Sequence, residues 1–340
     1  MNRSILLINL LYTSICVGQI PDSTLINGEK IAIELLQEIT VTPLNLIDKA
    51  IYLAEEKNVI LCSFGDMLRV PGSEKSLLQS KAGGADIRIL YSPLEAVNLA
   101  QANPDREVVF FAVGFETTAP ANALSVLHAE KEGILNYTIL ASHVLVPPAM
   151  EAILDDKFCN INAFLGAGHV CAIMGYKEYY PLAEKYKIPI VITGFEPLDL
   201  VQGIYMAVRQ LEKGIFEVEN QYSRVVKEEG NKAALKVIHQ VFEVGAREWR
   251  GIGEIPNSGY VLTKEFKDFD AELKFGISHI KVPENPNCMA GDILKGIKKP
   301  HQCDQFGKAC TPSNPLGAPM VSSEGACAAY YHFSSNLMTE

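Results

Sequence analysis

The sequence has little cysteine, a single tryptophan and no excess of positive charge. Its 340 residues include 8 cysteines, 1 tryptophan, 30 Lys and Arg and 40 Asp and Glu, which gives a formal net charge of -10. Eight cysteines in a chain of this length are too few for a scaffold held by disulfides. Because the charge is negative and no long run of Lys or Arg occurs, we do not expect the protein to bind nucleic acid.

Common catalytic and nucleotide-binding motifs are also missing. The sequence contains no P-loop, no serine-triad signature and no zinc-protease motif. The glycine-rich stretch GAGHVCAIMG comes closest to a dinucleotide fingerprint, but the spacing of Gly166, Gly168 and Gly175 does not fit G-x-G-x-x-G. Motifs of these kinds therefore assign no function.

Long apolar runs are absent after the N-terminus. The run from Ile5 to Val17 follows Arg3 and has the outline of a secretory signal peptide, but it lacks a clear small-x-small cleavage site. A buried first strand or helix gives the same pattern, and the run is too short and too broken to span a bilayer. We expect a cytoplasmic protein with no membrane partner.

From residue 46 onward, helical periodicity alternates with short β-branched runs, which is typical of βα units around parallel sheets. In the first such region Ser92 is the expected N-cap of a helix and Pro93 its first residue. We predict a first α/β domain over residues 41–133. Its expected helices and strands are helix 46–58, strand 59–64, helix 74–84, strand 87–92, helix 92–104 and strand 106–115.

The next region repeats the same rhythm, and we predict a second α/β domain over residues 134–214. Gly-Phe-Glu recurs after a strand at 114–116 and at 194–196, a spacing of 80 residues that suggests two similar domains. The expected helices and strands are strand 136–143, helix 147–158, strand 162–168, helix 176–187, strand 188–195 and helix 198–214.

The last region, residues 215–340, has a different character. A helix is expected at 231–244, but prolines and glycines dominate further on, so this tail cannot build a core from its own apolar residues. Half of the cysteines cluster there: Cys288, Cys303, Cys310 and Cys327. The other four lie in apolar surroundings and are expected to pack as small apolar side chains: Cys16, Cys62, Cys159 and Cys171.

Four clustered thiols satisfy either one tetrahedral zinc ion or the four irons of a cubane cluster. Structural zinc sites generally use tight C-x2-C or C-x4-C pairs, whereas the gaps here are fourteen, six and sixteen residues. Wider spacing suits an iron–sulfur cluster, because each cysteine binds a different corner of a larger object. Zinc and four unligated thiols remain the alternatives.

Several motifs in the chain resemble those of the hydrogenase maturation factor HypD family. The resemblance runs from residue 41 to about 333, and its motifs follow in the same order. They are FGDMLRVPGS at 64–73, GFETTAP at 114–120, LVPPAMEA at 145–152, GFEPLDL at 194–200, ENQYSRVV at 219–226, EWRGIGEIPNSG at 248–259 and MVSSEGACAAYY at 320–331.

The resemblance implies a fold and a function. It implies two similar parallel-sheet α/β domains and a loop-rich C-terminal domain, residues 215–340, built round a [4Fe-4S] cluster. It also implies a scaffold for assembling the Fe(CN)2CO centre of [NiFe]-hydrogenases, working with a small HypC-like chaperone and a HypE-like cyanide donor. The implied cluster ligands are Cys288, Cys303, Cys310 and Cys327.

The first 40 residues depart from the family pattern. Members carry Cys-Gly-Gly-His-Thr-His and then Gly-Pro-Gly-Cys-Pro-Val-Cys before the segment that here begins VTPL, but this chain reads ELLQEIT there and has no cysteine between Cys16 and Cys62. A divergent paralogue or a shifted reading frame would each produce this segment. The alternative function is a homologue that keeps the cluster for electron transfer or docking and cannot carry Fe(CN)2CO. Many relatives also have a further cysteine where this chain has Pro319.

Polar residues at strand ends are further candidates for the site. Glu116 and Glu196 follow the two Gly-Phe strands and could carry protons or contact partners, or each could cap the helix after it. His143 and His169 also lie at strand ends, where a lone histidine is commonly a hydrogen-bonded packing residue. Cys16 is the remaining candidate for an N-terminal thiol.

Overall fold

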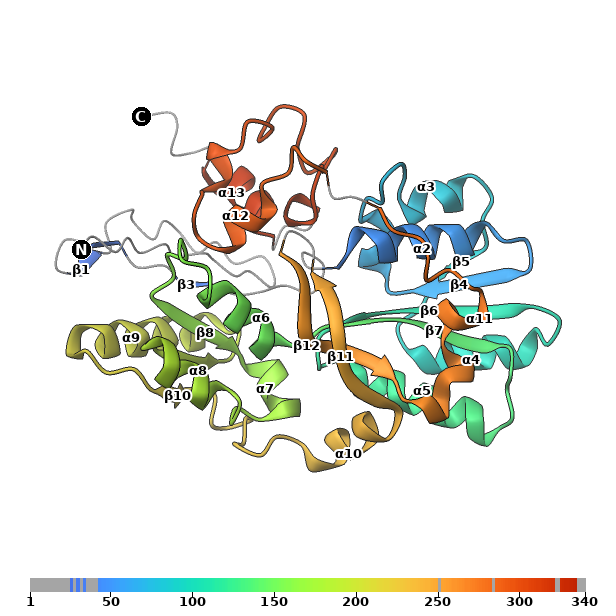
Figure 1. The fold of residues 1–340 in the computed structure, drawn as a ribbon, viewed down its shortest axis with the longest axis horizontal. Coiled ribbons are helices and arrows are strands. Elements are labelled where there is room, and N and C mark those ends of the chain that lie inside the picture. The colour runs from blue at the N-terminus through green and yellow to red at the C-terminus, as the bar shows by residue number, and fades with distance from the viewer. Residues whose placement is uncertain are drawn as a thin grey trace.

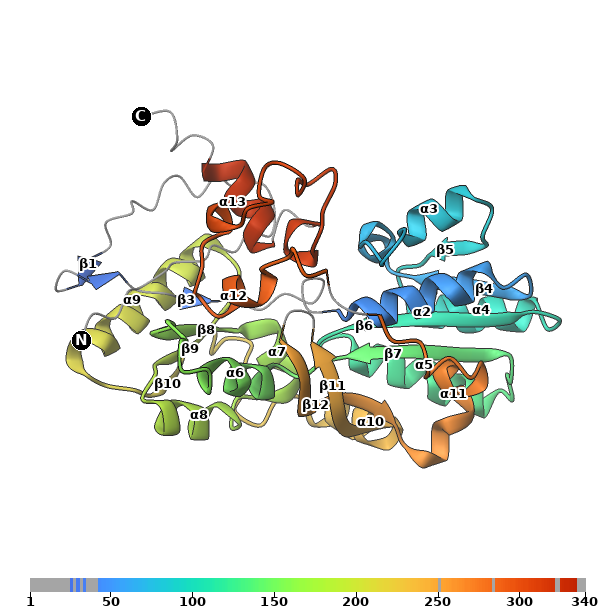
Figure 2. The same ribbon diagram turned by 45° about the horizontal axis from the view of Figure 1, so that its top comes forward.

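The computed structural model describes residues 25–26, 29–30, 33–34, 42–249, 252–282, 285–321 and 325–334. These residues form two α/β units, a long hairpin between the units and a small C-terminal lobe above the hairpin (Figures 1 and 2). Cys16, the candidate N-terminal thiol, lies outside the described residues. Strands β1 (Leu25–Ile26) and β2 (Glu29–Lys30) form a short antiparallel pair.

The first sheet is parallel, with the strand order β5-β4-β6-β7. Its strands are β4 (Val59–Ser63), β5 (Ile87–Ile89), β6 (Glu107–Gly114) and β7 (Tyr137–His143). Alternate side chains of β6 face opposite ways: Phe110 packs with α4 and α5, and Phe111 packs with α2. Both faces of the sheet are covered, which is why its strands read as continuous apolar runs.

Helices on both faces connect these strands. They are α2 (Leu44–Glu55), α3 (Leu77–Ala82), α4 (Pro93–Ala102) and α5 (Ala119–Lys131), with a 3-10 turn, η1 (Gly65–Arg69), after β4. Helix α4 begins as predicted, because the Ser92 hydroxyl accepts a 3.3 Å hydrogen bond from the Leu94 N–H and Pro93 takes the first helical position. Ser76 and Gln79 form a capping box at the start of α3.

The second sheet is also parallel, with the order β10-β9-β8-β3. Its strands are β3 (Ile33–Glu34), β8 (Ala163–Ala167), β9 (Ile190–Thr193) and β10 (Val218–Asn220). Helices α6 (Val146–Leu154), α7 (Gly168–Met174) and α8 (Tyr179–Tyr186) pack in one apolar cluster, and α9 (Pro197–Lys213) packs against Leu165 and Val191 in another. The prediction of two similar parallel α/β units is confirmed.

Two strands belong to different sheets from those that our predicted domain boundaries imply. We placed the strand at 136–143 in the second domain, but β7 is hydrogen-bonded to β6 and completes the first sheet. We also ended the second domain at residue 214, whereas β10 lies beyond that point and pairs with β9. The chain therefore crosses from the first unit to the second after His143, and it leaves the second sheet after Asn220.

A hairpin follows helix α10 (Lys232–Val241), which is shorter than predicted because Phe242 begins the next strand. Strands β11 (Phe242–Trp249) and β12 (Gly253–Leu262) form the hairpin, which lies between the two units (Figure 1). At the crossing, the Leu145 N–H donates to the Ser258 carbonyl over 2.8 Å, and Val144 forms a β-bridge with Gly259.

The chain then returns to the first unit before it enters the tail. The turn η2 (Lys264–Phe269) and helix α11 (Ala271–Lys274) lie against this unit, where Asp270 bridges to Ile139 of β7. The buried Lys49 ammonium forms a 2.7 Å ion pair with Glu272. These contacts fasten the start of the tail to the first sheet.

The C-terminal lobe has only short helical elements. They are α12 (Ala290–Leu294), η3 (Pro300–Gln302), η4 (Ala318–Met320) and α13 (Ala326–Ser334). Its own buried apolar cluster consists of Cys310, Met320 and Ala328, with a few partly buried neighbours. The lobe is therefore poor in apolar core, as its composition predicts. Within the described residues, no helix combines the length and the apolar character needed to cross a bilayer.

Candidate metal centre

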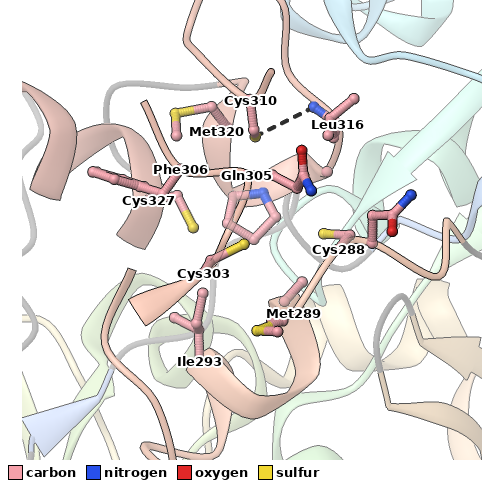
Figure 3. A pocket seen from close by; sticks show the side chains of 14 residues that line it. Cys288, Met289, Ile293, Cys303, Gln305, Phe306, Cys310, Leu316, Met320 and Cys327 are labelled. Atoms are coloured by element: carbon pink, nitrogen blue, oxygen red, sulfur yellow. Dashed lines mark hydrogen bonds between the residues drawn. The ribbon is translucent and has the colours of Figure 1, made fainter. Parts of the chain in front are cut away.

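The four tail cysteines line one cavity of the C-terminal lobe (Figure 3). Cys288 precedes α12, Cys303 follows η3, Cys310 lies in the loop after it, and Cys327 is in the first turn of α13. Residues far apart in the sequence are thus brought to one point of the lobe. Among the described cysteines, none forms a disulfide.

Local backbone turns present three of these thiols. The Cys288 N–H donates to the Asn285 carbonyl over 3.0 Å, and the Cys303 N–H donates to the Pro300 carbonyl over 3.1 Å. The Cys310 N–H donates to the Gln305 carbonyl over 2.9 Å. Gly307 closes the loop between Cys303 and Cys310 with a φ of 68°, a conformation that glycine adopts without strain.

The rest of the cavity wall is mainly apolar. Besides the thiols, it is lined by Asn287, Met289, Ala290, Ile293, Gln305, Phe306, Leu316, Gly317, Pro319 and Met320. No charged side chain stands among these lining residues. Pro319 contributes an apolar contact to this wall, and the four cysteines are its thiol donors.

Burial favours the protonated form of two of these thiols, Cys310 and Cys327, unless a metal ion binds. It raises the pKa of Cys310, while the N–H groups of Leu316 and Gly317 act in the opposite direction. Burial also raises the pKa of Cys327, and the three other tail cysteines add to this shift because neighbouring thiolates repel one another. Metal cations remove both penalties by binding deprotonated sulfur.

The thiols surround a space rather than a single point. Among the described residues, no three His, Cys, Asp or Glu side chains lie close enough together to hold one metal ion. Yet all four sulfurs belong to the wall of the same cavity, and the cysteines approach it from different sides (Figure 3). A donor set of this kind fits a ligand that is larger than one ion.

The strand-end residues of the first unit are buried. Gly114 and His143 are register partners on adjacent strands, and Glu116 follows Gly114 after one residue. Glu116 is 1% exposed and accepts a 3.1 Å hydrogen bond from the Val146 N–H. It therefore binds the first residue of α6, and the helix that follows it in sequence has Thr118 as its N-cap.

His143 fits the packing interpretation. Its Nε2 lies 2.8 Å from the Asn122 side-chain nitrogen, and its ring lies against Phe242. Complete burial, with a smaller contribution from Arg247, lowers the pKa of His143 to about 3. The ring is therefore neutral at physiological pH and has no access to solvent.

The second unit repeats the arrangement of a histidine and a glutamate at adjacent strand ends, but on the surface. His169 follows β8, is exposed and lies against Phe195, with ring centroids 4.7 Å apart and ring planes tilted by 45°. Glu196 follows β9, occupies the N-cap of α9 without a side-chain cap bond, and lies 3.8 Å from Arg224. Of the four strand-end candidates, these two are open to partners.

Sequence reasoning missed a polar cluster beside Glu196. Asp199 is 4% exposed, and both of its oxygens accept from Arg224, at 2.8 and 2.5 Å. The Arg224 guanidinium lies over the Tyr222 ring, and Gln221 donates to Asp199 over 2.8 Å. The two segments, GFEPLDL and ENQYSRVV, were visible as motifs, but their contact depends on the pairing of β9 with β10.

Comparisons with known proteins agree with the motifs. A family model named HypD, described as "Hydrogenase formation hypA family", matches residues 38–334. The chain is 47% identical over 307 residues to the hydrogenase maturation factor HypD of Rhodobacter capsulatus, covering 89% of this chain and 81% of the relative. It is 45% identical over 296 residues to the factor of the same name from Escherichia coli strain K12, covering 87% and 79%. The chain therefore belongs to the HypD family of hydrogenase maturation factors.

Proposed function

We propose that the protein is a scaffold for [NiFe]-hydrogenase maturation whose C-terminal lobe holds a [4Fe-4S] cluster. Cys288, Cys303, Cys310 and Cys327 would bind its irons, and the chain would act in the cytoplasm with HypC-like and HypE-like partners on the Fe(CN)2CO unit. The observation that carries the proposal is the convergence of all four thiols on one cavity without a charged side chain in its wall.

The shape of the donor set favours a cluster over zinc. A zinc ion needs all four sulfurs about 2.3 Å from one centre. In a cubane cluster each sulfur binds a separate iron, so the thiols stand around a wider object. The four cysteines line a shared cavity, and among the described residues no three of them form a group that could hold one ion, which supports the second arrangement. When bound, the cluster would supply reversible one-electron chemistry, and the protein's part is to hold and shield it.

The Fe(CN)2CO unit would be carried and passed on by the scaffold, so it needs a binding site distinct from that of the cluster. Iron that carries cyanide and CO prefers soft thiolate donors. No cysteine lies between Cys16 and Cys62, so the paired N-terminal thiols of the family pattern are missing. This observation favours the alternative function, a homologue that keeps the cluster for electron transfer or docking without carrying the cargo.

Substitution of one candidate ligand should remove most of the bound iron. We expect the anaerobically purified protein to contain about four irons and four sulfides per chain, as a cubane cluster requires. The change Cys303→Ser should lose most of this iron because one corner of the cluster has no thiolate. Cys159→Ser is the matched control, since Cys159 is outside the cavity wall and should keep the full content. Stoichiometric zinc without colour in the unaltered chain would contradict the proposal.

Complementation separates the scaffold from the alternative. In cells that lack their own HypD-family protein, the scaffold function predicts that this chain restores hydrogenase activity and that Cys303→Ser abolishes it. A chain that holds its iron in these cells but restores no activity would instead be the homologue that keeps only the cluster. Iron content and hydrogenase activity, measured on the same cultures, decide between the two.

A further inference from the structure

One short turn of the C-terminal lobe touches two of the four thiols. The N–H of Leu316 donates to the Cys310 sulfur over 3.4 Å. On its other side, Gly317 packs against Cys288: a Cβ added at Gly317 would lie 2.3 Å from the Cys288 sulfur. The two cysteines are far apart in sequence, and the turn fills the space between them.

Position 317 needs a glycine because there is no room for a side chain, not because of the backbone conformation. Its φ is not in the left-handed region, so an alanine could adopt the same backbone. The obstacle is the Cys288 sulfur, because real Cβ atoms essentially never come within 3.0 Å of another heavy atom. Any larger residue must push either the turn or the thiol out of place.

The turn is fixed on both sides, so it cannot simply move away. The Met320 N–H donates to the Gly317 carbonyl over 3.1 Å, and Met320 is buried. On the N-terminal side, the Asn314 amide donates to the Ala309 carbonyl over 2.9 Å, and the Thr311 N–H donates to the Asn314 carbonyl over 3.2 Å. An added methyl group would therefore act mainly on Cys288.

We propose that the Leu316–Gly317 turn is a positioning element that sets the spacing of Cys288 and Cys310 and raises the reduction potential of the group they bind. The inference rests on the proposed function, because it concerns residues that contact the cluster ligands. N–H donors aimed at a ligand sulfur stabilise the more negative, reduced state of an iron–sulfur cluster. The turn provides one such donor, the Leu316 N–H at the Cys310 sulfur, and it provides no side chain at Gly317 that would separate the thiols.

The substitution Gly317→Ala tests whether the turn sets the spacing of Cys288 and Cys310. We expect iron and sulfide content to fall several-fold, while Gly83→Ala keeps the wild-type content. In this control a Cβ meets nothing closer than 3.3 Å, at the end of α3 in the first unit. Circular dichroism should show the same α/β signal for both variants. A Gly317→Ala protein with full iron content would overturn the inference.

The effect of the turn on the reduction potential of the cluster can be tested by changing a backbone atom and no side chain. Replacement of Leu316 by leucic acid turns its N–H into an ester oxygen and removes one donor to Cys310. We expect a lower midpoint potential in a redox titration followed by electron paramagnetic resonance, with iron content retained. The same replacement at Leu273, which is 61% exposed on α11, should leave the potential unchanged. Equal potentials in all three proteins would overturn the tuning role, whereas a wild-type chain that holds no cluster would overturn the proposed function itself.

Discussion

Removal of iron is expected to unfold the C-terminal lobe, residues 285–334, and to leave both α/β units folded. Among the described residues, the lobe's own buried apolar cluster consists only of Cys310, Met320 and Ala328. Leu294 packs in the apolar cluster of the second unit, and α12 spans just five residues, Ala290–Leu294. Helices this short are not stable by themselves. On the proposed function, cluster binding would provide most of the folding free energy of the lobe, as metal binding does in small metal-dependent domains.

Hydrogen exchange measured by mass spectrometry would show this effect peptide by peptide. In the iron-free protein, amides of the lobe should exchange several orders of magnitude faster, because the lobe would open with a free energy close to zero. Peptides from β6 and β7 should keep their protection, since both strands are buried in a sheet covered on two faces. A protein with all four tail cysteines changed to serine provides the control that needs no chelator. If that protein kept the protection of the lobe, packing alone would hold the lobe and the metal would not be structural.

The sequence predicted the local elements of the fold better than their assembly. Buried strands such as β6 and capped helices such as α4 follow from residues close together in the chain, namely an apolar run and the Ser92–Pro93 pair. The assignment of the strand at 136–143 to the second domain was wrong, because β7 joins the first sheet. A run of apolar residues predicts burial in a sheet, but it carries no information about which strand lies beside it.

For the candidate site, too, local features were predictable from the sequence and contacts between distant segments were not. Clustered cysteines in a tail poor in apolar residues predicted a shared site, and the structure places all four in one cavity wall. The role of Gly317 was not predictable, because it depends on a contact with Cys288 across a gap in sequence. Capping of the helix after it was one of two roles considered for Glu116, beside proton transfer or partner contact, and the structure shows it bound to the Val146 N–H at α6. That the Glu116 carboxylate accepts a hydrogen bond from a backbone N–H agrees with the capping role. Which N–H donates it depends on how the chain crosses between the two units.

Truncation of Trp249 is expected to have the largest effect on stability outside the lobe. The ring is 1% exposed and packs in the cluster that includes Phe115 from the end of β6 and Ile255 from β12. Its Nε1–H donates to the Ser258 hydroxyl over 2.9 Å, and the Ser258 carbonyl accepts from Leu145 at the crossing between the units. Trp249→Ala should lower the free energy of unfolding by about 3–5 kcal/mol, the usual cost of removing a large buried aromatic side chain.

Calorimetry suits this measurement, because the chain has 1 tryptophan and the variant therefore loses its tryptophan fluorescence. Tyr91→Ala is the matched control, since that ring is 91% exposed and its removal should change stability by less than about 0.5 kcal/mol. Trp249→Phe should fall in between, because it keeps an aromatic ring but leaves the Ser258 hydroxyl without its donor. The hairpin lies between the two units and contacts both, so the Trp249→Ala protein should also unfold in two separate transitions. A single transition at the wild-type temperature would mean that the two units hold together without the hairpin.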